Sequence, residues 1–189
     1  MIPNLARDVR AFTSNAFLVT GDRTVVVDAG ANFDVVSKIR DHVDAVVLTH
    51  THSDHVGNVD AVRDAFDVET WGFDPAQPSV DHELADGDDV RMGDHDYRVL
   101  HTPGHKDDHV CLYASTAEVL FAGDLVFENG GFGRTDLDEG DRETLIRSID
   151  RLLSVVDEDL AAMHVGHGPS VTGRPYDDIE LASRAARLG

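Results

Sequence analysis

Three histidines and one aspartate stand within six residues of the chain, at His50, His52, Asp54 and His55. Imidazole nitrogens and a carboxylate together suit zinc, iron or manganese. The group directly follows the apolar run 45–48, which is typical of a strand buried on both faces. Because a rigid strand end can direct several side chains at one point, the segment predicts a metal site rather than a loop of solvated histidines.

Three more candidate ligands follow other predicted strands, each near a glycine. His105 comes after residues 97–101, Asp124 after 119–122 and His167 after 160–164. Glycine allows the backbone to approach a site closely. Seven donors exceed the four that one tetrahedral ion takes, so they suit two ions. We expect the other histidines to lie outside the ligand set: His42, His82, His95, His101, His109 and His164.

Short apolar runs alternate with amphipathic segments along the chain. Residues 16–20 and 24–27 predict a hairpin, and further strands are expected at 45–48, 68–71, 97–101, 110–114, 119–122 and 160–164. Helices are expected at 32–40, from near 55 to 66, at 145–156 and at 177–188. The apolar strands need cover on both faces, which favours a layered α/β arrangement, αββα, in a single domain over 1–189.

The four motifs, in this order, resemble those of the metallo-β-lactamase superfamily from Asp28 to His167. The resemblance implies a four-layer αββα sandwich with a dinuclear site in a shallow groove at the sheet edges. It assigns His50, His52 and His105 to one metal, Asp54, His55 and His167 to the other, and Asp124 to both as a bridge. Asp28 would orient the site without binding metal. His52 argues against the flavodiiron branch, which carries Glu there.

A pair of divalent ions about 3.5–4 Å apart can hold a bridging hydroxide and stabilise the oxyanion that forms when it attacks. We expect zinc, with iron or manganese as alternatives. Asp54 can also orient the nucleophile or accept its proton. No separate acid that could protonate the leaving group is visible, so a good leaving group is favoured. A thiolate is one, because its thiol has a pKa of about 8.5.

Within the superfamily, the chain is most similar to the small glyoxalase II-like branch. The segment 131–136, Gly-Phe-Gly-Arg-Thr-Asp, matches a family loop that places a basic residue, here Arg134, near the carboxylate of the substrate. The resemblance implies hydrolysis of small anionic thioesters such as S-lactoyl conjugates. Arg134 could instead form an ion pair with Asp136 or Asp138.

Lys106 is a second candidate for substrate binding, since it directly follows His105 and is one of only two lysines. It could instead pair with Asp107 or Asp108. Lys106 and Asp108 stand where the glyoxalase II family usually has Thr and Gly.

Other reactions remain open at this stage. Persulfide dioxygenases share the fold and the ligand positions, but they use one iron held by residues that match His50, His105 and Asp124. Hydrolysis of a lactone or another ester is a further alternative. A true β-lactamase is disfavoured because residues 1–10 contain no apolar signal core.

The charge of the chain bears on its partners and surroundings. Its 36 acidic residues, 28 of them Asp, face 14 Arg and 2 Lys, for a formal net charge of −20. Such a charge repels phosphate backbones and anionic membranes, so we expect neither nucleic acid nor membrane as a partner, and a tRNA-processing nuclease is disfavoured. Asp in excess with few Lys is typical of adaptation to high salt. We expect a cytoplasmic protein, and the sequence leaves its oligomeric state open.

Overall fold

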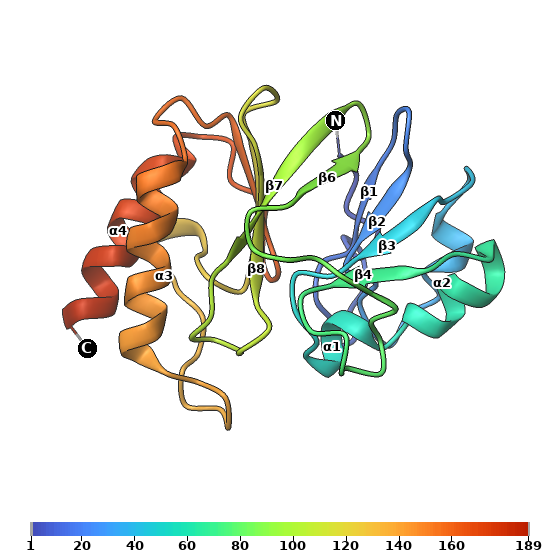
Figure 1. The fold of residues 1–189 in the computed structure, drawn as a ribbon, viewed down its shortest axis with the longest axis horizontal. Coiled ribbons are helices and arrows are strands. Elements are labelled where there is room, and N and C mark those ends of the chain that lie inside the picture. The colour runs from blue at the N-terminus through green and yellow to red at the C-terminus, as the bar shows by residue number, and fades with distance from the viewer. Residues whose placement is uncertain (1, 189) are drawn as a thin grey trace.

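The computed structural model describes residues 2–188, and Figure 1 shows two sheets packed together with helices on their outer sides. The first sheet has the order β1-β2-β3-β4-β5. Its strands β1 and β2 are antiparallel, and the remaining neighbours are parallel. The strands are β1 (Phe17–Val19), β2 (Val25–Val27), β3 (Ala45–Val47), β4 (Thr70–Gly72) and β5 (His82–Glu83).

The second sheet has the order β10-β9-β8-β7-β6. Strands β9 and β10 are parallel, and the other neighbours are antiparallel. A hairpin-rich sheet with one parallel edge strand needs a long connection, and the chain between β9 and β10 supplies it as a helix. The strands are β6 (Asp89–Met92), β7 (His95–His101), β8 (Val110–Ala114), β9 (Val119–Gly123) and β10 (Ala162–Val165).

Helices cover the outer face of each sheet, which confirms the four-layer αββα fold. Elements η1 (Val36–Lys38), α1 (Ser53–Val56) and α2 (Val59–Phe66) accompany the first sheet, and η2 (Glu128–Gly130), α3 (Arg142–Val155) and α4 (Pro175–Leu188) the second. Strand alternation fixes the packing: Val25 and Val27 point into the core between the sheets, whereas Val26 packs under Val59 and Val62 of α2. On the far side, Leu145, Ile149 and Leu152 seat α3 on the second sheet.

Most predicted elements are confirmed, and two of them differ from the expectation. Residues 32–40 form only the short 3₁₀ turn η1, because Asn32 takes a left-handed φ of 61° and Ile39 is extended. The helix expected from near His55 is divided into α1 and α2, since the backbone leaves the helical region at Asn58. The short strands β5 and β6 were not predicted.

None of the helices within residues 2–188 combines the length and apolar composition needed to cross a bilayer.

One buried histidine of the core makes the fold sensitive to acid. His164, on β10, is 8% exposed, packs against Phe17 and Phe121, and has Nδ1 2.8 Å from Ser170 Oγ. Burial lowers the pKa of His164 to about 4. The unfolded chain takes up this proton near pH 6.5, so the stabilisation is complete above that pH and is lost as the pH falls toward 4.

We therefore expect the wild type to lose about 2 kcal/mol more unfolding free energy than His164→Gln between pH 7 and pH 5. Urea unfolding at both pH values measures this difference. His42→Gln, at a side chain that is 71% exposed, is the matched control and should behave like the wild type. An equal acid response in wild type and His164→Gln would contradict the assignment.

Candidate metal centre

The segment after β3 carries four of the candidate ligands: His50, His52, Asp54 and His55. Residues 49–52 lead from the strand into α1, with His52 in an extended conformation just before the helix and His55 inside it. His50 and His55 are almost fully buried, at 1% and 0% exposure. Their ring centroids are 3.9 Å apart. Burial, together with the neighbouring imidazoles of His55, His109 and His105, lowers the pKa of His50.

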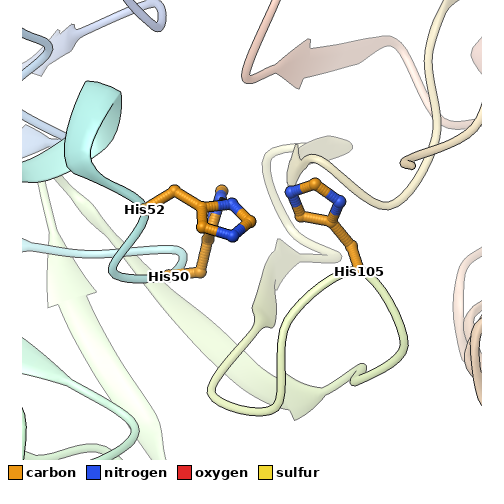
Figure 2. Close-up of side chains that lie close together, drawn as sticks. All are labelled: His50, His52 and His105. Carbon is orange, nitrogen blue, oxygen red and sulfur yellow. Dashed lines mark hydrogen bonds between the residues drawn. The ribbon is translucent and has the colours of Figure 1, made fainter. Parts of the chain in front are cut away.

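His105 meets His50 and His52 from the opposite sheet, and Figure 2 shows the three rings facing one another. The potential ligand atoms of these three side chains all lie within 4.8 Å of one another. His105 Nδ1 donates to the Arg134 carbonyl oxygen at 2.8 Å, which leaves Nε2 with its lone pair toward the cluster. Gly104, at φ 123°, packs against the Leu145 backbone where a Cβ would collide, so the turn that presents His105 requires glycine.

A second group consists of Asp54, His55 and His167, whose potential ligand atoms also lie within 4.8 Å of one another. His167 follows β10 and is the most exposed of the three, with its Nε2 3.0 Å from Asp54 Oδ2. That hydrogen bond raises the pKa of His167. Burial would raise the pKa of Asp54, but the bond from His167 and the charge of His55 outweigh it and lower the pKa.

Asp124 lies between the two groups. Its Oδ1 is 3.5 Å from His55 Nε2, and its Oδ2 is 3.4 Å from His105 Nε2 and 3.5 Å from His167 Nε2. Burial would raise the pKa of Asp124, but these neighbours outweigh it and hold the pKa well below its ordinary value. The backbone of Gly166 passes so close that a Cβ there would collide with Asp124 Oδ1. One ionised carboxylate therefore faces histidines of both groups.

The donor set fits two metal ions. Among the described residues, the buried side-chain nitrogen and oxygen atoms that lack a hydrogen-bond partner are His55 Nε2, His105 Nε2 and Asp124 Oδ1. Leaving such atoms unsatisfied costs free energy, and the Asp124 carboxylate lies within 3.5 Å of both histidine nitrogens. Cations held by the two groups would satisfy all three atoms, and imidazole with carboxylate is a donor set suited to zinc, iron or manganese. The seven predicted ligands thus come together in space.

Asp28 supports the site from behind. It accepts hydrogen bonds from Thr49 N and Thr49 Oγ1, both at 2.8 Å, and from His55 Nδ1 at 2.9 Å. The last bond orients the ring so that Nε2 faces Asp124. The side chain is only 3% exposed, so water cannot replace these contacts. This is the position that the sequence resemblance gave to Asp28.

We expect Asp28→Asn to weaken metal binding by about 10–100-fold, because an amide nitrogen would face one of the three donors and tilt the His55 ring. Competition with a chromogenic chelator on demetallated protein measures the affinity. Asp89→Asn, on the exposed carboxylate that pairs with Arg98, is the matched control and should leave the affinity unchanged. Unchanged metal affinity in Asp28→Asn would show that Asp28 does not orient the site.

His109 is not a candidate ligand, but it contacts the backbone of Asp124. This role was not predicted from the sequence. His109 is fully buried, and its Nε2 accepts from the Asp124 backbone N–H at 3.0 Å while Nδ1 donates to Thr102 Oγ1 at 2.9 Å. Burial and the nearby His105 lower its pKa to about 3, so the ring stays neutral and can accept. Its spacing of four residues from His105 was the available signal.

The other histidines lie away from the ligand groups in varied surroundings. His101 stacks on Phe73, with 3.8 Å between ring centroids. Close polar partners of the remaining ones are Asp44 for His42, Glu69 for His82, Thr116 for His95 and Ser170 for His164.

The two predicted substrate-binding cations are both engaged with carboxylates. Arg134 is exposed and makes two hydrogen bonds to Asp136, at 2.9 and 2.8 Å. Lys106 is buried, with Nζ 2.8 Å from Glu139 Oε2 and 3.6 Å from Asp108 Oδ1. Their contact with substrate stays a prediction. Glu139 could not be identified from the sequence, because it lies 33 residues from Lys106 with no motif to connect them.

Comparison with known proteins agrees with this geometry. Residues 9–164 match the family model of the metallo-beta-lactamase superfamily. Hydroxyacylglutathione hydrolase GloC of Haemophilus influenzae is 31% identical, in an alignment that covers 87% of this chain and 90% of that protein. The crystal structure of BLEG-1 B3 metallo-beta-lactamase is 29% identical, with a TM-score of 0.76 and coverage of 97% and 96%. TTHA1623, solved in a di-iron-bound form, is 32% identical, with a TM-score of 0.68 and coverage of 91% and 92%. The chain belongs to the metallo-beta-lactamase superfamily.

Proposed function

We propose that this protein is a dinuclear metal hydrolase that cleaves small anionic thioesters in the manner of glyoxalase II, with zinc as its metal. The observation that carries the proposal is the position of Asp124 between two histidine groups, each of which has three donors. The likeness to a hydroxyacylglutathione hydrolase over most of both chains supports the thioester. The di-iron form of TTHA1623 makes iron the first alternative metal, and manganese the second.

The candidate ligands have separate roles in the proposed reaction. His50, His52 and His105 would hold one ion, Asp54, His55 and His167 the other, and Asp124 both. When bound, a pair of such ions supplies Lewis acidity and lowers the pKa of water toward about 7. The bond from His167 keeps the pKa of Asp54 below its ordinary value despite burial, so the carboxylate is ionised at neutral pH and can accept a hydrogen from water and orient it. A thiolate leaves without a proton donor, and none of the ligand groups includes an uncommitted acid.

The test is hydrolysis of S-lactoyl thioesters by protein purified without added metal, followed by metal analysis. We expect turnover with two ions per chain, and little turnover in His50→Ala and Asp124→Ala. Oxygen uptake with a persulfide, one iron per chain and no thioester cleavage would identify a persulfide dioxygenase instead. Cleavage of lactones or simple esters in place of thioesters would identify another hydrolase of the superfamily.

We also propose that the protein works in concentrated salt within the cytoplasm, so these assays belong in molar KCl. The support is the excess of Asp and the net charge of −20, whose self-repulsion salt would screen. Equal stability with and without molar KCl would contradict the salt adaptation.

A further inference from the structure

An exposed phenylalanine stands beside the metal centre. Phe12 is 75% exposed, whereas the other exposed large apolar side chains of the described residues are aliphatic. Its ring stacks on the imidazole of His167, with centroids 5.9 Å apart and planes at 19°. One face of the phenyl ring therefore lies toward a candidate ligand, while most of its surface is open to solvent. An exposed aromatic ring beside a polar site offers an apolar contact to whatever enters.

The backbone under Phe12 is fixed to the ligand-bearing loops, so the ring is presented in place. Residues 12–15 are bonded both to residues 31 and 32 and to the segments that carry Asp54 and His167. The bonds are Asn32 Nδ2 to Phe12 O at 2.8 Å, Ala31 N to Thr13 Oγ1 at 2.8 Å, Ser14 N to Asp54 O at 3.2 Å and Asn15 N to Gly166 O at 2.7 Å. A ring on such a segment can contact a bound molecule without the entropic cost of ordering a loose loop.

We propose that Phe12 determines specificity by contacting the apolar part of the acyl group of the substrate. The inference rests on the proposed thioesterase function and adds the class of acyl group to it. When a thioester carbonyl carbon is attacked between the two ligand groups, the rest of the acyl chain begins one bond away from it, and a ring stacked on His167 lies beside that position. The charged thiol carrier gains nothing from an apolar ring, whereas an alkyl chain is removed from water by it.

The test uses acetyl, butanoyl and hexanoyl thioesters of N-acetylcysteine, a small anionic thiol. We expect kcat/KM of the wild type to rise with chain length. Phe12→Ala should lose about tenfold with the hexanoyl substrate and less than twofold with the acetyl substrate, and Phe12→Leu should fall between. Leu188→Ala, at an apolar side chain that is 88% exposed on α4, is the matched control and should keep the wild-type profile.

Two readouts besides activity complete the test. Calorimetry should show hexanoate binding to the wild type more tightly than to Phe12→Ala by a similar factor, and both proteins should hold the same metal. An equal loss for every chain length together with loss of metal would overturn the proposal, because Phe12 would then only position His167. An unchanged chain-length profile in Phe12→Ala would overturn it as well. A wild type inactive on all thioesters would defeat the proposed function, and hexanoate binding would still decide the role of Phe12.

Discussion

Replacing Asp124 by Asn should abolish most of the hydrolysis and remove at least one metal ion per chain. Among residues 2–188, the Asp124 carboxylate is the only one that lies within 3.5 Å of His55, His105 and His167 together. An amide of the same size keeps the packing but loses the negative charge that balances two cations. Changing a residue that only supports a ligand costs about 10–100-fold in affinity or activity, so a ligand to both ions should exceed the upper end of that range.

Metal analysis and thioester turnover measure this effect, with Asp89→Asn as the matched control. Asp89 is an exposed carboxylate on β6, paired with Arg98, so its loss changes the net charge equally without touching the centre. Full metal content and near-normal turnover in Asp124→Asn would contradict the assignment of Asp124 to both ions. Loss of a single ion with turnover retained would leave Asp124 as a ligand and reject the dinuclear mechanism.

The candidate ligands could be selected from the sequence because each lies on a segment that follows a predicted strand. An apolar run predicts a strand, and the end of the strand lies at an edge of the sheet. The residue types that follow the strand then indicate which side chains could bind a metal. His50, Asp124 and His167 all come within a few residues of β3, β9 and β10. The same logic could not find β5 and β6, because β5 has only two residues and both strands carry exposed polar side chains on one face. Short edge strands have too few apolar positions for a period to show.

Contacts between distant loops could not be predicted either. The sequence identifies Lys106 as an unusual cation beside His105, but nothing in it connects Lys106 to Glu139. Only the folded connection after β9 brings that loop against the turn at Gly104, where Asp141 N donates to Gly104 O. The same connection carries the Arg134 carbonyl that orients His105. Local patterns specify the ligands, and tertiary packing specifies their supports.

Lys106 and Asp108 form a buried ion pair beside the candidate ligands. Their exposures are 5% and 4%, and Asp108 Oδ2 accepts from Thr51 Oγ1 at 2.5 Å. Thr51 stands between His50 and His52, so the ion pair connects the turn of His105 to the loop of the other two ligands.

We expect Lys106→Met to lower the free energy of unfolding by about 3 kcal/mol, because it leaves the Asp108 carboxylate buried without a cation. Lys106→Met/Asp108→Asn should recover part of that loss, since no buried charge then remains uncompensated. Urea unfolding of the metal-loaded proteins measures both. Lys38→Met is the matched control: Lys38 is the other lysine, exposed on η1, and its loss should cost little.

The kinetics of Lys106→Met distinguish this support from substrate binding. A lysine that only joins the loops should leave KM for an anionic thioester unchanged and should weaken metal binding by His50, His52 and His105. A lysine that binds the substrate carboxylate should raise KM while the unfolding free energy stays near that of Lys38→Met. The geometry favours the first result, because Nζ already makes bonds of 2.9 and 2.8 Å to Glu139. A substrate carboxylate would have to displace the Glu139 carboxylate from Nζ before it could bind there.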